Sequence, residues 1–289
     1  MSKNLFASGH TACAGCGQSL GARLVIDAAG PNTIVVNNTG CLEVFSTKYP
    51  ETAWEVPWIH SLFENAAAVA SGVESALKFM GTKDTINVIA QAGDGGTADI
   101  GLQALSGMLE RNHDILYVCY DNEAYMNTGI QRSGLTPFDT NTTTSPIGSQ
   151  SLGNIRPKKP LPEIAAAHGV PYVATASVAF PNDVQRKVKK ALSIKGAKYL
   201  QIHVPCPLGW RHESGATIQV AKAAFETGLY PLVEFEFGKV VAVRQIQPKP
   251  VEEYLKLQGR FKHLMNNPEE IKKIQAIADA NIEKYGLKA

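Results

Sequence analysis

The sequence predicts an α/β fold in which a largely parallel β-sheet carries helices on both faces. Short apolar runs alternate with helical stretches over most of the 289 residues. This alternation is typical of strands joined by crossover helices. Hydrophobic residues make up 44% of the chain, which is ample for a buried core. The length suits one large domain or two of ordinary size.

The predicted strands are short apolar runs between turn signals. They are TIVVNN, TINVIA, DILYVCY, VPYVAT and KYLQIHV, at residues 33–38, 85–90, 114–120, 170–175 and 198–204. Helices are predicted between strands, at residues 64–79, 100–111 and 182–193. The first helix is rich in small residues, so we expect it to pack closely against the sheet. The other two have amphipathic periodicity.

Two segments interrupt the alternation of strands and helices. Residues 123–160 are dominated by Gly, Ser, Thr, Asn and Pro, and a loop of that length in a compact domain is usually functional. After about residue 232 the chain predicts a hairpin, PLVEFEFGKVVAV, and then charged helices at residues 251–265 and 268–286. We therefore expect a domain at residues 1–232 and a C-terminal arm at residues 233–289. The arm either contacts a neighbouring subunit or is a solvated C-terminal segment.

The charge pattern indicates neither a nucleic-acid nor a membrane partner. There are 28 Lys and Arg residues against 26 Asp and Glu, and neither sign forms a long block. The first ten residues, MSKNLFASGH, lack the apolar core of a secretion signal, and no run approaches the roughly 20 apolar residues that span a bilayer. We expect a cytoplasmic protein.

A glycine-rich turn follows the second predicted strand. In VIAQAGDGGTADIG, Gly93, Gly95 and Gly96 allow the backbone to approach a ligand closely, and the start of the next helix presents free N–H groups suited to a phosphate. Taken alone, the motif also fits an ordinary tight turn between a strand and a helix.

Asn122 follows the third predicted strand, 28 positions after Asp94. The carboxyl ends of neighbouring parallel strands lie side by side, so Asp94 and Asn122 can face a common point. Magnesium takes oxygen ligands and commonly shares them between protein and phosphate. Here the sequence resembles the thiamin diphosphate motif, which runs Gly-Asp-Gly, a spacer and Asn-Asn. This chain has Asp121 before Asn122, a departure that keeps an asparagine at the ligand position.

The five cysteines are Cys13, Cys16, Cys41, Cys119 and Cys206. The Cys-x-x-Cys pair at residues 13–16 can be half of a zinc site, a dithiol redox couple or part of an iron–sulfur site. A second pair for zinc is missing, and a redox couple would leave Cys41 and Cys206 without a role. Cys119 has apolar neighbours in a predicted strand and is interpreted as core. The other four, in turns marked by Gly or Pro, suit a [4Fe–4S] cluster.

Together, the cofactor and cysteine motifs resemble the thiamin diphosphate-binding beta subunits of 2-oxoacid:ferredoxin oxidoreductases. The resemblance covers nearly the whole chain and rests on CAGCGQ, TGC, WIHSLFENAA, GDGG, DNEAYMNTGIQ and PCPLGW. It implies the thiamin diphosphate-binding fold, with both cofactors in residues 1–232. The implied activity is coenzyme A-dependent oxidative decarboxylation of a 2-oxoacid, with electrons passing from thiamin diphosphate to the cluster and on to ferredoxin. SLFENAA and CPLGW resemble the pyruvate branch, while 2-oxoisovalerate and oxalate are alternative substrates.

The resemblance also implies the residues that bind each cofactor. The implied cluster ligands are Cys13, Cys16, Cys41 and Cys206, and the implied magnesium ligands are Asp94, Asn122 and the carbonyl of Ala124. The residues implied around thiamin diphosphate are Gln18, Cys41, Gly93, Asp94, Gly95, Gly96, Asn122, Glu123, Ala124, Tyr125, Met126 and Asn127. Many family members have a glutamate in place of Gln18. An amide can still hydrogen-bond the aminopyrimidine, but it cannot act as an acid or a base.

No catalytic side chain is assigned within this chain, although Asn127 is a candidate. The resemblance places the carboxylate that activates thiamin diphosphate on a partner subunit, and Glu64 is interpreted as a helix-start residue. His10 and His60 are interpreted as hydrogen-bonded structural histidines rather than proton-transfer groups. The three tryptophans, Trp54, Trp58 and Trp210, are interpreted as packing residues.

The implied partners are subunits of alpha, gamma and delta type, ferredoxin, the 2-oxoacid and coenzyme A. Four cysteines used in one cluster leave a single cysteine, so any second all-cysteine cluster must lie on another subunit. Two other function classes stay open. One is a thiamin diphosphate decarboxylase without redox chemistry, and the other is a zinc-stapled interaction module without catalysis.

Overall fold

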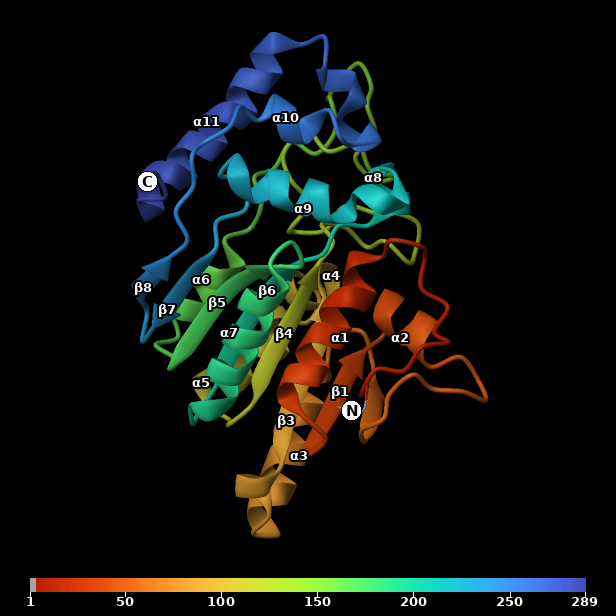
Figure 1. Ribbon diagram of the computed structural model, residues 1–289, viewed down its shortest axis with the longest axis vertical. Helices are drawn as coiled ribbons and strands as arrows, with labels where there is room; N and C mark the ends of the chain where they lie inside the picture. The colour runs from red at the N-terminus through yellow and green to blue at the C-terminus, as the bar shows by residue number, and fades with distance from the viewer. Residues whose placement is uncertain (1–3) are drawn as a thin grey trace.

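An eight-stranded sheet forms the centre of the molecule (Figure 1). The structure is a computed structural model that describes residues 4–289. Residues 1–3, with which the expected first domain begins, lie outside the described residues. The strand order is β2-β1-β3-β4-β6-β5-β7-β8. The first six strands in the chain run parallel, and β7 and β8 are antiparallel to their neighbours. The predicted α/β fold with a largely parallel sheet is confirmed.

The strands lie at or near the predicted runs, with one addition. Their bounds are β1 Thr33–Asn38, β2 Trp58–Ser61, β3 Asn87–Gly93, β4 Leu116–Asp121, β5 Tyr172–Ser177, β6 Lys198–His203, β7 Val233–Glu236 and β8 Lys239–Val243. The added strand is β2, at the sheet edge. Every residue of β4, β5 and β6 is buried, as expected for parallel strands covered on both faces.

Helices cover both faces of the sheet (Figure 1). One face carries α1 Gly17–Ala29, α2 Cys41–Ser46 and α7 Pro181–Ser193, and the other carries α3 Ala66–Phe79, α5 Leu102–Glu110 and α6 Leu161–Ala166. Helix α3 packs through the buried small residues Ala66, Ala67 and Ala70, as its composition predicts. A helix of five residues, α4 Asp94–Ala98, directly follows β3.

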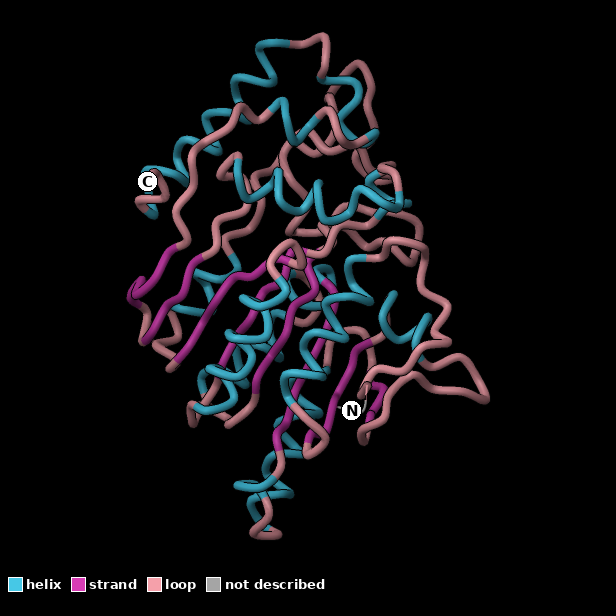
Figure 2. The backbone as a smooth tube through the Cα atoms, in the orientation of Figure 1, coloured by secondary structure: helices cyan, strands magenta, loops and turns pink. Residues whose placement is uncertain are grey.

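The C-terminal part lies beyond the carboxyl edge of the sheet (Figures 1 and 2). It contains α8 Pro207–Trp210, α9 Thr217–Glu226, α10 Glu252–Leu255, a 3-10 helix at Gly259–Leu264 and α11 Pro268–Tyr285. The predicted hairpin is confirmed, and it extends the main sheet because β7 pairs with β5. The expected helix at 251–265 is instead broken. Gly259 donates its N–H to the carbonyl of Arg211 (3.0 Å) and approaches that residue too closely for a side chain.

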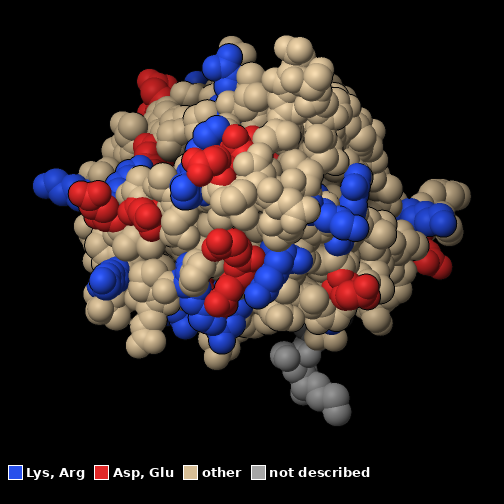
Figure 3. Space-filling model, turned by 90° about the horizontal axis from the view of Figure 1, so that it is seen from above, with Lys and Arg blue, Asp and Glu red and all other residues tan. Residues whose placement is uncertain are grey.

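The long segment between β4 and α6 contains no helix or named strand, as predicted (Figure 2). On the face seen in Figure 3, Lys and Arg intermingle with Asp and Glu without a continuous field of either sign. Among the helices of residues 4–289, none has the length and apolar character needed to cross a membrane.

Candidate functional site

Four neighbouring strands deliver polar residues to one edge of the sheet. Asp94 follows β3, Asn122 follows β4, Cys41 lies three residues after β1, and Cys206 lies three residues after β6. Register aligns these ends, since Gly93 pairs with Tyr120 and Asp121 pairs with His203. In parallel sheets, ligands bind at this carboxyl edge.

A cleft at this edge brings together the residues expected around thiamin diphosphate. Its lining includes Gln18, Cys41, Gly93, Asp94, Gly95, Gly96, Asn122, Ala124, Tyr125, Met126 and Asn127. Glu123 is the exception, because it does not line the cleft. Its backbone adopts a left-handed conformation, with φ of 67°, and its side chain points away from the cleft to ion-pair with Lys158 and Arg260.

Five residues of this cleft were not expected from the sequence. They are Asn38, Thr39, Gly40, Phe63 and Thr128. Three of them directly follow or end β1, so the same strand-end argument that located Asp94 and Asn122 could have located them.

Three oxygen-bearing groups, on Asp94, Asn122 and Ala124, converge in the cleft. The side-chain amide of Asn122 ends 2.8 Å from the carbonyl oxygen of Ala124 and 2.9 Å from Oδ1 of Asp94. With its nitrogen toward them, the amide donates to both. With its oxygen toward them, three acceptors face one another with no proton between, which is the arrangement that a hard cation satisfies.

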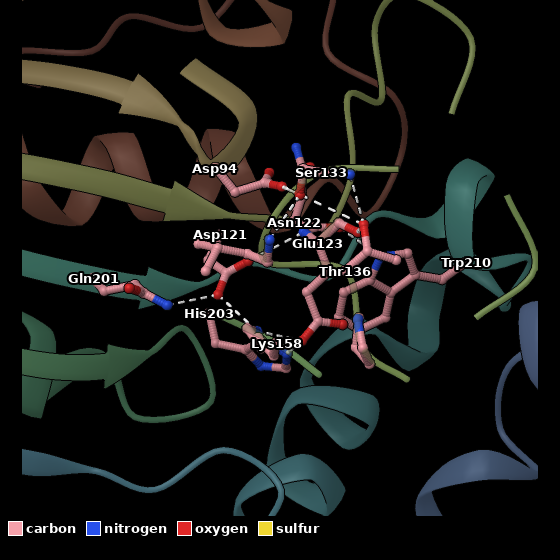
Figure 4. A network of polar contacts seen from close by, with 12 residues as sticks. Asp94, Asp121, Asn122, Glu123, Ser133, Thr136, Lys158, Gln201, His203 and Trp210 are labelled. Carbon is pink, nitrogen blue, oxygen red and sulfur yellow. Dashed lines mark hydrogen bonds and ion pairs between the residues drawn. The ribbon is translucent and has the colours of Figure 1, made fainter. Parts of the chain in front are cut away.

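Asp94 is fully buried at this point, at 1% exposure. Burial raises the pKa of its carboxyl well above the usual range, and the nearby charge of Asp121 raises it further. The hydroxyl of Ser133 donates a short hydrogen bond to its other oxygen (Figure 4). A bound cation would offset the cost of the buried negative charge.

A buried ion network lies behind the cleft (Figure 4). Lys158 contacts Asp121 Oδ2 at 2.8 Å and Glu123 Oε1 at 2.7 Å, and Arg260 contacts Glu123 Oε2 at 2.6 Å. Burial acts against the charge of Glu123, but Lys158 and Arg260 hold its pKa well below the usual range. Gln201 donates to Asp121 Oδ2 at 2.7 Å.

Four cysteines line a second cavity of about 170 Å³ beside the cleft. They are Cys13, Cys16, Cys41 and Cys206. Gln18, Cys41, Asn122 and Asn127 line both spaces. The fifth cysteine, Cys119, is fully buried in the sheet, which confirms its assignment to the core.

The Cys-x-x-Cys loop is seated against the end of β6. Gly17 donates its N–H to the carbonyl of Pro205 at 3.1 Å, and a Cβ on Gly17 would lie 2.7 Å from that oxygen. Only a glycine allows so close an approach. The contact brings Cys16 near Cys206, although the two are far apart in sequence.

Burial and mutual proximity make the thiols of Cys41 and Cys206 hard to ionise. Burial raises the pKa of Cys41 to about 12, and the neighbouring Cys206 and Cys16 contribute. Burial likewise raises the pKa of Cys206 to about 11. Because metal ligation requires a thiolate, a positively charged metal centre would have to stabilise these sulfurs. Across residues 4–289, no three His, Cys, Asp or Glu side chains converge as ligands of one metal ion.

The remaining sequence candidates lie near the cleft or in the core. The ring of His10 packs at a tilt beside Phe6, with ring centroids 5.1 Å apart, and His60 hydrogen-bonds Thr39 at 2.8 Å. Glu64 precedes α3, which begins two residues later than expected. The tryptophans differ in environment: Trp54 is buried, Trp58 half-buried, and Trp210 fully buried with its indole N–H donating to the carbonyl of Asn122 at 2.8 Å.

Comparisons with known proteins agree with this geometry. The family model described as "Thiamine pyrophosphate enzyme, C-terminal TPP binding domain" matches residues 38–202. Pyruvate synthase subunit PorB of Methanosarcina barkeri is 58% identical over 289 residues, covering 99% of this chain and 98% of the relative. Ketoisovalerate oxidoreductase subunit VorB of Pyrococcus abyssi is 50% identical over 276 residues, covering 93% and 88%.

Among solved structures, the chain resembles 2-oxoglutarate:ferredoxin oxidoreductase from Magnetococcus marinus, determined with 2-oxoglutarate, coenzyme A and succinyl-CoA bound. The TM-score is 0.59 at 22% sequence identity, and the match covers 93% of this chain and 94% of that chain. At this identity the likeness shows a shared fold.

Proposed function

The chain belongs to the thiamin diphosphate-binding beta subunits of 2-oxoacid:ferredoxin oxidoreductases, and from this premise we propose that it serves a pyruvate:ferredoxin oxidoreductase. The proposal rests mainly on one observation. The cleft and the cavity of four cysteines adjoin each other, because several residues line both. In the proposed reaction the bond between the carboxylate and the carbonyl carbon breaks and carbon dioxide leaves. The acyl group bonds to the sulfur of coenzyme A, whose thiol proton is released, and two electrons pass singly to ferredoxin.

Magnesium ligation is assigned to Asp94, Asn122 and the carbonyl of Ala124. Magnesium holds oxygen ligands at about 2.0–2.1 Å in an octahedron, so neighbouring ligand oxygens lie about 2.9 Å apart. The separations of 2.8 and 2.9 Å around the Asn122 amide match that spacing. These three groups would form half of a shell that a diphosphate completes. When bound, thiamin diphosphate supplies the electron sink for decarboxylation.

Other residues of the cleft would orient the cofactor. Gln18 is buried at 3% exposure and accepts a hydrogen bond from Asn122 at 3.4 Å, so its amide is directed toward the cleft. The backbone at Gly93, Gly95 and Gly96 would approach the diphosphate closely. Asn127 lines both spaces and is the one catalytic candidate of the chain.

The activating carboxylate is assigned to a partner subunit. Among the described residues that line the cleft, Asp94 is the only carboxylate, and it is assigned to magnesium. The complete enzyme would therefore combine this chain with subunits of alpha, gamma and delta type. We assign the cofactors to residues 1–232 and a subunit contact to the arm at residues 233–289.

Cys13, Cys16, Cys41 and Cys206 are assigned to one [4Fe–4S] cluster. Zinc would draw four sulfurs to about 2.3 Å from a single ion, whereas these thiols surround a cavity of about 170 Å³. A cube with iron at alternate corners suits sulfurs that surround a space. The space between the four sulfurs favours the redox enzyme over the zinc-stapled module and over a decarboxylase with incidental cysteines.

Iron analysis and low-temperature electron paramagnetic resonance of five single serine variants test the ligand set. Serine at Cys13, Cys16, Cys41 or Cys206 should damage the cluster and electron transfer. Cys119→Ser should keep near-normal iron, because that thiol is sealed in the sheet, and is the matched control. Cluster loss in Cys119→Ser with retention in Cys206→Ser would overturn the assignment, and zinc without iron would favour the interaction module.

Pyruvate is the proposed 2-oxoacid. The pyruvate synthase relative is 58% identical and the ketoisovalerate oxidoreductase relative 50%. The difference favours pyruvate, and 2-oxoisovalerate is the second candidate. Turnover of the assembled enzyme across a panel of 2-oxoacids would decide, with pyruvate expected to give the highest kcat/KM.

A further inference from the structure

Glu123 occupies an unusual position in the proposed magnesium site. It lies between Asn122 and Ala124, both assigned as ligands, and it is a non-glycine residue with a left-handed backbone, at φ of 67°. That conformation is disfavoured for a residue with a Cβ and persists only where the surroundings enforce it. It allows Asn122 and Ala124 to present their oxygens on one side of the segment.

Several contacts hold Glu123 in this conformation. Its carbonyl accepts a hydrogen bond from Thr136 Oγ1 at 2.7 Å, and its N–H donates to Asp121 Oδ1 at 3.2 Å. Its carboxylate forms ion pairs with Lys158 at 2.7 Å and with Arg260 at 2.6 Å. Lys158 is shared with Asp121, whereas Glu123 is the one carboxylate of the described residues with which Arg260 forms an ion pair.

Arg260 reaches the site from the C-terminal arm. It belongs to the 3-10 helix Gly259–Leu264 and is 1% exposed. Its guanidinium stacks on Trp210 at 3.6 Å from the ring centroid. Trp210 in turn donates to the carbonyl of Asn122 at 2.8 Å. Arg260 therefore acts on the ligand segment through two paths, the carboxylate of Glu123 and the indole of Trp210.

The ion pair between Arg260 and Glu123 is buried, so it should contribute more than a surface ion pair does. The side chains of Arg260 and Glu123 are 2% and 4% exposed. Removing one partner of such a pair leaves a buried charge without its counter-ion. The carboxylate of Glu123 would then move toward Lys158 alone or toward water, and the left-handed segment would lose a restraint.

We propose that Arg260 is a positioning residue that holds the Asn122–Ala124 segment in the geometry that binds magnesium and thiamin diphosphate. The proposal rests on the proposed function of the cleft. It makes the C-terminal arm part of the cofactor site, although no arm residue lines the cleft. Groups that orient metal ligands typically change metal affinity by roughly 10–100-fold when they are removed.

The test compares Arg260→Met and Arg260→Lys with Arg244→Met in the assembled oxidoreductase. Arg244 is the matched control, because it also lies in the arm and stacks on an aromatic ring, Phe180 at 3.8 Å, but is exposed and is not among the ion-pair partners of Glu123. Calorimetry measures the magnesium concentration that gives half-maximal thiamin diphosphate binding. Thermal unfolding without cofactor measures stability separately.

Arg260→Met should raise the required magnesium concentration roughly 10–100-fold. Arg260→Lys should raise it less, because the charge remains, and Arg244→Met should leave it unchanged. At saturating magnesium and thiamin diphosphate, the kcat of Arg260→Met should be closer to the wild-type kcat than its cofactor affinity is to the wild-type affinity. Adding Glu123→Gln to Arg260→Met should cost less than the sum of the two single effects, because the two residues act as one pair.

A wild-type magnesium requirement in Arg260→Met, even with lowered stability, would overturn the proposal. An equal loss in Arg244→Met would do so too, because it would indicate general destabilisation. If Arg260→Met does not assemble, Arg260→Lys is the deciding variant. An unchanged magnesium requirement in Arg260→Lys would then overturn the proposal. Failure of the wild-type enzyme to bind thiamin diphosphate would instead refute the proposed function of the cleft.

Discussion

Asp94 is a buried carboxylate whose charge the chain does not fully balance. Burial and the neighbouring Asp121 raise its pKa well above the usual range. Lys158, the nearby cation, is bonded to Asp121 and Glu123. A divalent cation at Asp94 would supply the missing positive charge, which explains why a carboxylate is tolerated at 1% exposure.

Asp94→Ala should abolish magnesium-dependent thiamin diphosphate binding, with a loss of at least about 100-fold, while the chain still folds. The variant removes the charged group that we propose as a magnesium ligand and would leave the diphosphate unneutralised. Calorimetry with magnesium and thiamin diphosphate measures the loss. Asp84→Ala is the control, since Asp84 is 88% exposed at the other end of the sheet. Undiminished binding in Asp94→Ala would exclude the assignment.

At the residue scale, the sequence predicts contacts between residues at the ends of neighbouring parallel strands. It does not predict contacts between segments that are far apart in the sequence. Asp94 and Asn122 follow consecutive strands separated by one helical connection, so their proximity follows from parallel pairing. The ion pair between Glu123 and Arg260 joins the loop after β4 to the C-terminal arm. No local pattern indicates a partner 137 positions away.

Several elements were not predicted, including the helices α1, α2, α6, α8 and α9 and the strand β2, and α1 and β2 were missed for different physical reasons. Helix α1 lacks a side-chain cap, lacks acidic residues in its first turn, and contains glycines. Its position depends on the contact of Gly17 with Pro205, a tertiary interaction. Strand β2 has four residues, and Ile59 and His60 are exposed. So short a strand carries little periodicity for a sequence to reveal.

Strand β7 is fastened to the sheet by a buried carboxylate. Glu234 is 4% exposed and accepts from Arg186 at 2.6 Å, Lys190 at 2.9 Å and Tyr172 Oη at 2.8 Å. Burial acts against its charge, but these donors hold its pKa down at about 2. Because the pKa is lowered in the folded state, the stabilisation is complete above about pH 4.5 and disappears as the pH falls toward 2.

Glu234→Gln should therefore lower the free energy of unfolding by about 2 kcal/mol at pH 7. This figure is less than the whole pKa shift implies, because solvent screens the partly exposed Arg186 and Lys190. The difference from wild type should shrink between pH 4.5 and pH 2. Urea unfolding at several pH values measures it. Glu236→Gln is the control, because Glu236 pairs with Lys190 at 3.0 Å but is 39% exposed. An equal, pH-independent loss in both variants would contradict this account.

Across the whole molecule, the candidate site is assembled from distant parts of the chain. Cys13 and Cys16 precede α1, Cys41 follows β1, and Cys206 follows β6, yet all four line one cavity. The arm adds Arg260 behind the cleft. Both spaces therefore form only when the strands that carry these residues, β1, β3, β4 and β6, are paired in the sheet. Within the described chain, Asp94 remains the one carboxylate that lines the cleft.

The isolated chain should not reduce ferredoxin with a 2-oxoacid, even when supplied with magnesium, thiamin diphosphate and a reconstituted cluster. It offers no second carboxylate in the cleft for cofactor activation. Its fifth cysteine, Cys119, is sealed in the core, so the chain cannot hold another all-cysteine cluster for onward electron transfer. Adding the remaining subunits should restore turnover. The measurement is ferredoxin reduction by the chain alone and by the reassembled complex at equal cluster content. If the chain alone matched the rate of the complex, the partner requirement would be wrong, and the activating group and the electron path would both have to lie within these 289 residues.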